Sequence, residues 1–304
     1  MNSTPPFNCP ICDSRLDGNV IAWEPSAQGK VGIQKCATCG LHMTYPRFAE
    51  PQGEYLGTTL ERWEAKYGAI ERGERLHDRH KNYLEETAII GQYLPNGRLL
   101  DVGCNAGWLM GYLQKTGRYD LEGVEPSPIL ARIARRRLGV TIHQSYLDEL
   151  TERDNAYDGL MATDVIEHIL PEKINEFVSN IHRVLKPNGY VFIKTPNVLF
   201  TALKSDLVSR LPEMGKRFML RGRDVWDAKE HVIHWDSKNL ARIFTAHQLE
   251  SVTFLVPYPV ETTNSPLGAR IARQMIYQTA RRLPAAGGVP SITQDIFFIA
   301  RKKM

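Results

Sequence analysis

The sequence predicts an α/β fold with a doubly wound sheet of seven strands, preceded by a small N-terminal unit that is held by four cysteines. From about residue 98 onward, short apolar runs alternate with segments of helical periodicity, which is typical of a parallel sheet with helices on both faces. One of these runs breaks into a glycine-rich turn and continues as an amphipathic segment. Two Cys-x-x-Cys pairs near the start of the chain predict the N-terminal unit.

The expected strands and helices follow from that alternation. We expect strands near residues 98–103, 120–125, 140–143, 158–162, 189–194, 251–256 and 293–300. Helical periodicity covers residues 126–138, 171–185, 237–247 and 267–283. The turn Lys186-Pro-Asn-Gly189 separates one helix from the buried strand that follows it. Because ligands of such sheets bind beyond the carboxyl ends of the strands, we expect the site at that edge.

The segment Leu99–Gly107 carries the strongest signal in the chain. It runs Leu-Leu-Asp-Val-Gly-Cys-Asn-Ala-Gly, a strand that passes through a glycine-rich loop into the start of a helix. Gly103 and Gly107 allow the backbone to approach a ligand closely, and Asp101 can accept a hydrogen bond from an ammonium or hydroxyl group. A second run ends at Glu125 about twenty residues later, where a nucleoside-binding fold needs an acceptor for ribose hydroxyls. The pair predicts a Rossmann-like fold.

These motifs resemble those of the class I S-adenosylmethionine-dependent methyltransferases, over roughly residues 91–304. The resemblance implies S-adenosyl-L-methionine as the cofactor, with Asp101 and Gly103 near its methionine part and Glu125 on its ribose. Tyr146 or Leu147 is expected to cover the adenine, because the acid that the family often has there is missing. The expected cofactor-binding residues are Asp101, Gly103, Asn105, Gly107, Glu125, Tyr146 and Thr163. The alternative is a dehydrogenase-type fold, but it requires Gly-x-Gly-x-x-Gly, and Asp101 stands two positions before Gly103.

Length and composition fit one full α/β domain with a small additional unit. The chain has 304 residues, of which 42% are hydrophobic, enough to build a core. A net charge of +4 gives no argument for nucleic-acid binding by itself. The apolar runs have the length of strands, so we expect no transmembrane segment, and the first six residues lack the features of a signal peptide. We therefore expect a cytoplasmic protein.

The two cysteine pairs, Cys9/Cys12 and Cys36/Cys39, predict a four-cysteine zinc ribbon. Two disulfides are the alternative, but the lack of an export signal and the knuckle spacing favour Zn²⁺. Four thiolates leave no open position for substrate, so the ribbon is expected to be structural or to take part in recognition. It resembles the ribbon in front of many bacterial methyltransferases thought to act on sugars and other small metabolites. The fifth cysteine, Cys104, is interpreted as a small residue tolerated in the cofactor loop.

We expect three segments along the chain: the zinc ribbon over residues 1–48, a helical linker or lid over residues 49–92 and the methyltransferase domain over residues 93–304. Interleaved charges in the second segment predict solvated helices, with Trp63, Tyr67 and Tyr83 packed on the core. A basic insertion at about 199–230 matches neither a simple strand nor a simple helix pattern. It is expected to form a substrate-binding cap, with a solvated loop as the alternative.

Acidic residues and a histidine follow the fourth strand in the run Thr163-Asp-Val-Ile-Glu-His168. If a helix begins at Asp164, then Asp164, Glu167 and His168 share one face and can hold a hard divalent ion. The later run Glu230-His-Val-Ile-His-Trp-Asp236 is expected to face the same cleft. The arrangement resembles two O-methyltransferase groups, those of ubiquinone biosynthesis and those that methylate the terminal ribose 2′-hydroxyl of small RNAs. That resemblance implies a divalent site, such as a Mg²⁺ site, formed by Asp164, Glu167, His168 and His231.

An alkyl hydroxyl is a poor nucleophile at neutral pH, so a metal that lowers its pKa or a histidine that removes its proton would assist transfer. The candidate catalytic residues are Glu167, His168, His231 and His234. The alternative is that these side chains order the helix start without a metal. The favoured function is O-methylation of a small hydroxylated metabolite such as a sugar or glycan precursor. Two rivals are a ribose 2′-O-methyltransferase of RNA, with nucleic acid the less favoured partner, and a non-catalytic accessory protein that binds the cofactor.

Overall fold

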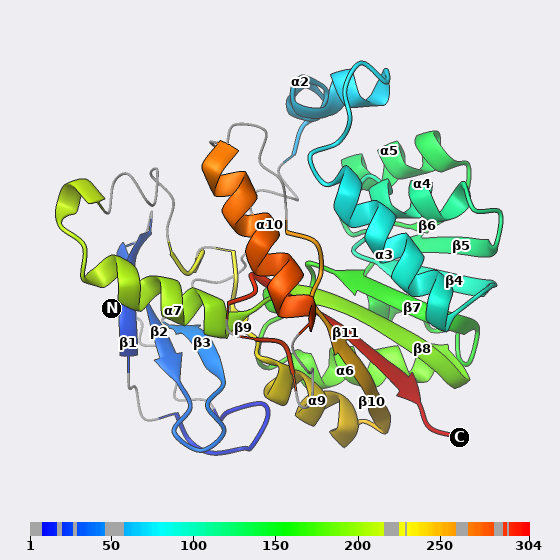
Figure 1. Ribbon diagram of the computed structural model, residues 1–304. Coiled ribbons are helices and arrows are strands. Elements are labelled where there is room, and N and C mark those ends of the chain that lie inside the picture. The colour runs from blue at the N-terminus through cyan, green and yellow to red at the C-terminus, as the bar shows by residue number, and fades with distance from the viewer. Residues whose placement is uncertain are drawn as a thin grey trace.

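The computed structural model describes residues 8–16, 20–26, 29–45, 58–215, 225–228, 230–259, 267–282, 288–290 and 292–304. These residues form a large sheet with the strand order β10-β11-β8-β7-β4-β5-β6 and a small sheet with the order β1-β2-β3-β9. Figure 1 shows the large sheet in the centre of the molecule, with helices on both of its faces, and the small sheet at one side. The seven-stranded α/β sheet predicted from the sequence is confirmed.

The strands of the large sheet lie where the apolar runs predict them. Their bounds are β4 (Gly97–Val102), β5 (Tyr119–Val124), β6 (Thr141–His143), β7 (Tyr157–Thr163), β8 (Leu185–Pro196), β10 (Leu249–Leu255) and β11 (Asp295–Lys302). Strands β6, β5, β4, β7 and β8 pair in parallel, whereas β11 is antiparallel to both β8 and β10. The chain order reverses at β4, between β5 and β7, so a ligand site is expected beyond the ends of these strands.

Two layers of helices enclose the large sheet. One layer contains α3 (His80–Tyr93), α4 (Trp108–Gln114) and α5 (Pro128–Leu138), and the other contains α6 (Ile174–Val184) and α9 (Ser237–Ala246). Adjacent residues of β7 pack against different helix layers. Leu160 lies in the core with α6 and α9, whereas Met161 lies in the core with α3, α4 and α5. Alternation along a strand therefore buries both faces of the sheet.

The small sheet contains β1 (Val20–Ser26), β2 (Gly29–Lys35), β3 (His42–Tyr45) and β9 (Ile233–His234), all paired antiparallel. Its fourth strand comes from the segment that we assigned to the methyltransferase domain. Cys9, Cys36 and Cys39 lie in the same hydrophobic cluster as Ile233 and Trp235. The N-terminal unit and the large domain thus share a sheet and a core.

The linker segment forms α2 (Leu60–Glu71) before α3. Trp63 is buried against Ala106 of the glycine loop and against Leu130 and Ile133 of α5. Tyr67 lies beside it, with its ring centroid 5.7 Å from that of Trp63. The aromatic residues of this charged segment therefore attach α2 to the outside of the cofactor loop. Residues 46–57, which include the end of the expected ribbon and the start of the linker, lie outside the described residues.

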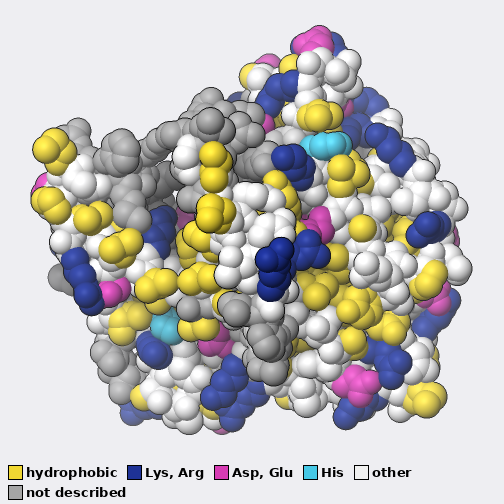
Figure 2. Space-filling model, viewed as in Figure 1, with side chains coloured by type: hydrophobic (Ala, Val, Ile, Leu, Met, Phe, Trp, Pro, Cys, Tyr) yellow, Lys and Arg dark blue, Asp and Glu magenta, His cyan; other side chains and the backbone are white. Residues whose placement is uncertain are grey.

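The insertion begins with a regular helix, α7 (Val198–Ser209), which differs from our expectation of an irregular segment. Asn197 caps it by accepting a hydrogen bond from the backbone N of Leu199 at 3.1 Å. Figure 2 shows hydrophobic side chains exposed along α7 and along α10 (Leu267–Arg282). Four basic residues of the expected cap, Lys216, Arg217, Arg221 and Arg223, lie outside the described residues. Within the described part of the chain, every helix is too short or too polar to cross a membrane.

Candidate active site

The glycine loop follows β4 and leads into α4. Gly103 and Gly107 have φ values of +68° and +71°, in the left-handed region that favours glycine. A Cβ on Gly103 would lie 2.6 Å from Cγ2 of Val165, and a Cβ on Gly107 would lie 2.5 Å from Cδ1 of Leu138. Asn105 between them also has a positive φ, of 52°. Both the backbone conformation and the space thus require the glycines that the sequence places there.

Glu125 joins this loop to the end of β5. Its Oε2 accepts a hydrogen bond from the backbone N of Asn105 at 2.8 Å, and its Oε1 accepts one from the backbone N of Ser127 at 2.8 Å. Burial raises the pKa of Glu125. Asp101 is also buried, and its burial, together with the carboxylates of Glu86 and Glu125, raises its pKa well above the usual range. The structure therefore brings the two predicted acids and the glycine loop together at the reversal of strand order.

The remaining predicted cofactor residues lie at neighbouring strand ends. Thr163 is the last residue of β7. Tyr146 follows β6 and is 43% exposed, whereas Leu147 is buried in the core. Of the two residues expected near the adenine, only Tyr146 is therefore exposed.

Asp164 lies apart from the other predicted divalent ligands. Its carboxylate Oδ2 is 2.5 Å from Nη1 of Arg79 and 3.5 Å from Nζ of Lys194. Burial opposes its ionisation, but the charges of Arg79 and Lys194 hold its pKa well below the usual range. This placement differs from our expectation of a helix face shared by Asp164, Glu167 and His168. The reason is that Asp164 has a φ of 57° and that the helical turn begins only at Ile166.

Glu167, His168 and His231 form a compact cluster. One ligand atom of each lies within 4.8 Å of the others. Oε2 of Glu167 accepts a hydrogen bond from the hydroxyl of Thr195 at 3.0 Å, while Oε1 is buried without a hydrogen-bond partner among the described residues. Nδ1 of His168 lies 2.8 Å from the carbonyl O of Glu230. Because a carbonyl only accepts, Nδ1 must carry a proton, and the lone pair of the neutral ring is therefore on Nε2, the nitrogen that could bind a metal.

The electrostatics of this cluster follow from its burial. Burial and the neighbouring Asp164 carboxylate raise the pKa of Glu167 to about 7. Burial and the neighbouring His168 lower the pKa of His231 to about 4. His234 lies behind the cluster, with its ring centroid 6.3 Å from that of His231 and its Nε2 3.2 Å from the hydroxyl of Thr44. The geometry therefore separates His234 from the three residues that can share an ion.

Three residues near the site were missed at the sequence level. Lys194 is buried at the end of β8 between Asp164 and Glu86, Thr195 donates to Glu167, and Arg79 pairs with Asp164. A signal existed for the first two, because they are polar residues at the end of an apolar strand. None existed for Arg79, which is one charge among many in the linker.

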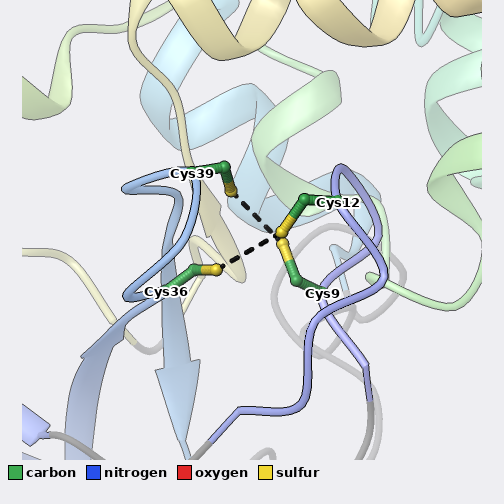
Figure 3. A group of neighbouring side chains, drawn as sticks. All are labelled: Cys9, Cys12, Cys36 and Cys39. Carbon is green, nitrogen blue, oxygen red and sulfur yellow. Dashed lines mark hydrogen bonds between the residues drawn. The ribbon is translucent and has the colours of Figure 1, made fainter.

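The four cysteines of the N-terminal unit come together from two knuckles that face each other (Figure 3). The Sγ atoms of Cys9 and Cys39 are 3.5 Å apart, and those of Cys12 and Cys36 are 3.6 Å apart. These distances far exceed a disulfide bond of about 2.05 Å. They match the separation of about 3.8 Å between thiolates in a tetrahedral zinc site with Zn–S bonds of about 2.3 Å. The cluster thus has the donor set and spacing of a structural zinc site.

Comparison with known proteins supports the family. Residues 74–253 match a family described as a methyltransferase domain. The chain belongs to this family. The methyltransferase domain match contains the glycine loop, Glu125, Glu167 and His231, whereas the four-cysteine cluster lies outside it.

Two relatives are ubiquinone biosynthesis O-methyltransferases. The protein from Azorhizobium caulinodans is 28% identical over 135 residues, which cover 43% of this chain and 51% of the relative. The mitochondrial protein from Dictyostelium discoideum is 27% identical over 187 residues, which cover 53% of this chain and 56% of the relative. The chain therefore spans about half the length of the curated relatives it matches.

Two solved structures share the fold of the methyltransferase domain. A candidate S-adenosylmethionine-dependent methyltransferase from Listeria monocytogenes has a TM-score of 0.51 and 15% identity, with 74% of this chain and 99% of that chain covered. A chain of the complex between the Haloferax volcanii Trm112 methyltransferase activator and a candidate methyltransferase has a TM-score of 0.53 and 14% identity, with 80% and 96% covered. At these identities the likeness shows the fold, which is the predicted class I methyltransferase sheet.

Proposed function

We propose that this protein is an S-adenosylmethionine-dependent methyltransferase that O-methylates a small hydroxylated metabolite with the help of a divalent ion. The observation that carries the proposal is the cluster that Glu167 and His168, which follow β7, form with His231, which precedes β9. Strand β7 lies beside β4, the strand that leads into the glycine loop. A methyl donor held by the loop and an acceptor hydroxyl held by the cluster would meet at one edge of the sheet.

The residues of the glycine loop fit the cofactor. Gly103 and Gly107 let the loop adopt left-handed backbone conformations, with which it can turn its backbone toward a ligand. The Glu125 carboxylate keeps lone pairs for ribose hydroxyls beyond the two backbone hydrogen bonds it accepts. When bound, S-adenosylmethionine supplies an electrophilic methyl group. The protein then has to orient the acceptor and exclude competing nucleophiles.

The cluster of Glu167, His168 and His231 fits a divalent ion. Glu167 offers a buried carboxylate oxygen without a hydrogen-bond partner among the described residues, and His168 offers Nε2 with its tautomer set by the carbonyl of Glu230. An ion held there would lower the pKa of an acceptor hydroxyl. Asp164 is left out of this proposed ligand set because Arg79 and Lys194 occupy its carboxylate.

The substrate class rests on two likenesses. The relatives are named as O-methyltransferases of ubiquinone biosynthesis, which supports oxygen as the acceptor atom of a small molecule. The ribbon resembles those of methyltransferases thought to act on sugars, and a sugar or glycan precursor is therefore our narrower hypothesis. The four cysteines are proposed to hold one Zn²⁺ with a structural role, as their free thiols and spacing support.

The test is transfer of a deuterated methyl group from labelled S-adenosylmethionine into a fractionated cell extract, followed by mass spectrometry. The zinc-loaded protein is assayed with Mg²⁺ and with EDTA, and Glu167→Gln serves as the matched variant that keeps the side-chain shape. We expect label in a small polyhydroxylated metabolite with Mg²⁺, and little label with EDTA or with the variant. Label confined to the RNA fraction would replace the proposal with RNA methylation. Full transfer in EDTA with zinc still bound would remove the divalent ion from it.

A further inference from the structure

The N-terminal cysteine unit reaches the candidate active site through its last strand. Strand β3 pairs with β9 in the register His42 opposite His234 and Met43 opposite Ile233. The pairing continues past β9, because the backbone N of Thr44 donates to the carbonyl O of Val232 at 2.9 Å. A strand that begins three residues after Cys39 therefore runs alongside the segment that carries His231.

The peptide group between His231 and Val232 is held from both sides. Its carbonyl O accepts a hydrogen bond from the hydroxyl of Thr44 at 2.7 Å. Its N–H, which belongs to Val232, donates to the carbonyl O of Glu167 at 2.8 Å. A single peptide group thus connects the cysteine unit on one side with the backbone of Glu167 on the other. The position of His231 relative to Glu167 depends on both contacts.

The same hydroxyl also sets the tautomer of His234. A threonine hydroxyl has one proton, and Thr44 gives it to the carbonyl of His231. The contact of 3.2 Å between Thr44 Oγ1 and Nε2 of His234 then requires Nε2 to be the donor. His234 is buried and its ring lies edge-on to that of Trp226, with the centroids 5.5 Å apart. His234 therefore acts as a fixed support behind His231.

The cysteine knuckle is itself anchored to the large domain. Nδ2 of Asn239, in α9, donates to the carbonyl O of Cys39 at 3.4 Å, and Nδ2 of Asn175, in α6, donates to the carbonyl O of Pro10 at 3.1 Å. Leu41 and Met43 are buried in the core that also contains Ile233 and Trp235. The unit is thus anchored to the large domain at both cysteine knuckles and along β3.

We propose that the four-cysteine unit is an internal positioning element for the active site and that Thr44 is the positioning residue through which it holds His231. This inference rests on the proposed function, in which His231 shares a divalent ion with Glu167 and His168. It assigns the N-terminal unit a role in ordering the site of its own chain, separate from any contact with substrate.

The test compares Thr44→Val, which keeps the branched shape and removes the hydroxyl, with Thr44→Ser, which keeps the hydroxyl. Binding of Mn²⁺ to the zinc-loaded protein is measured by electron paramagnetic resonance in the presence of S-adenosylhomocysteine. We expect the valine variant to lose about tenfold in Mn²⁺ affinity, the size typical for loss of a group that orients a metal ligand, and the serine variant to stay within about twofold of the wild type. Zinc content and S-adenosylhomocysteine affinity should be the same in all three proteins.

A second measurement does not depend on activity, and its wild-type part does not depend on the folding of a variant. Proton–nitrogen correlation spectra of the imidazole rings should show His234 in the Nε2–H tautomer in the wild type and in Thr44→Ser. The resonances of His231 should shift in Thr44→Val. An Nδ1–H tautomer in the wild type, or a valine variant with wild-type Mn²⁺ affinity and unshifted His231 resonances, overturns the proposal.

Failure of the proposed function would look different. If Glu167→Gln binds Mn²⁺ as tightly as the wild type, the divalent site is not the one proposed. The imidazole spectra then test the positioning role of Thr44 without the metal measurement. A shift of the His231 resonances in Thr44→Val but not in Thr44→Ser supports this role, and no shift in either variant overturns it.

Discussion

The carboxylate of Asp164 lies 2.5 Å from the guanidinium of Arg79, across the gap between the end of β7 and the start of α3. The same carboxylate is 3.5 Å from the ammonium of Lys194, which is almost fully buried and also 3.3 Å from Glu86. Asp164 thus forms ion pairs with two cations at the edge of the candidate active site. Because Arg79 is the N-cap residue of α3, the ion pair with Asp164 joins the start of α3 to the end of β7.

Asp164→Asn should therefore act on stability more than on metal binding. Removing the carboxylate leaves Arg79 and the buried Lys194 with less compensation, so we expect a loss of about 2 kcal/mol in the free energy of unfolding. Urea unfolding followed by circular dichroism measures this loss. Glu167→Gln is the matched control, because it should weaken Mn²⁺ binding with a smaller change in stability. If Asp164→Asn lost Mn²⁺ binding while its free energy of unfolding stayed unchanged, Asp164 would instead be a metal ligand.

Gly103→Ala should weaken cofactor binding strongly. An alanine at this position would have to keep a φ of +68°, and its Cβ would lie 2.6 Å from Cγ2 of Val165. The loop therefore has to move. We expect at least a tenfold weaker affinity for S-adenosylhomocysteine, measured by isothermal titration calorimetry, and a loss of about 1 to 2 kcal/mol in stability. Gly117→Ala is the control that separates backbone strain from a steric clash. Gly117 has a φ of +66°, but an added Cβ would meet no atom within 4 Å. That variant should lose at most about 1 kcal/mol in stability, and its cofactor affinity should stay unchanged.

Cys9→Ser should remove the zinc and destabilise the small sheet. Three thiolates and a hydroxyl form a poorer zinc site, and the knuckles that this site joins hold β3 in place. We expect about one zinc per chain in the wild type, clearly less in Cys9→Ser and a lower melting temperature for the variant. Cys104→Ser is the control, because Cys104 lies in the cofactor loop and outside the four-cysteine cluster. Equal zinc content in Cys9→Ser and the wild type would refute the assignment.

Acid should loosen the attachment of α2 through His77. Burial and the charge of Arg79 lower the pKa of His77 to about 4, and its Nδ1 accepts a hydrogen bond from the backbone N of Arg79 at 3.0 Å. The neutral ring therefore suits the folded state. In the unfolded chain His77 has the usual histidine pKa of about 6.5. The contribution of the neutral His77 ring to stability is therefore complete above pH 6.5 and is lost as the pH falls towards 4.

The measurement is the melting temperature as a function of pH for the wild type and His77→Phe. Phenylalanine keeps an aromatic ring beside Tyr67 and Trp108 but cannot bind a proton. We expect a smaller fall in melting temperature between pH 6.5 and 4 for the variant. Parallel curves for the two proteins would assign the acid sensitivity to other groups.

The predicted parts of the fold depend on local rules. Strand and helix positions in the large sheet follow from apolar periodicity, and the glycine loop follows from backbone conformations that only glycine adopts easily. The four-cysteine cluster follows from the reach of each Cys-x-x-Cys knuckle. The helix α7 was missed because the basic composition of the insertion obscured the cap at Asn197 and the short apolar pattern after it.

The sequence by itself determined the α/β sheet, the cofactor loop with Glu125 and the four-cysteine cluster, because each depends on residues that are close along the chain or on a spacing specific to that motif. Only the tertiary structure decided that Asp164 faces Arg79 and Lys194, and that Thr44 meets His231 from 187 positions away. Strand β9 has only two residues, too few to show a period, and it forms because the large domain presents it to β3. Contacts of this kind depend on how distant elements pack, and no local pattern encodes them.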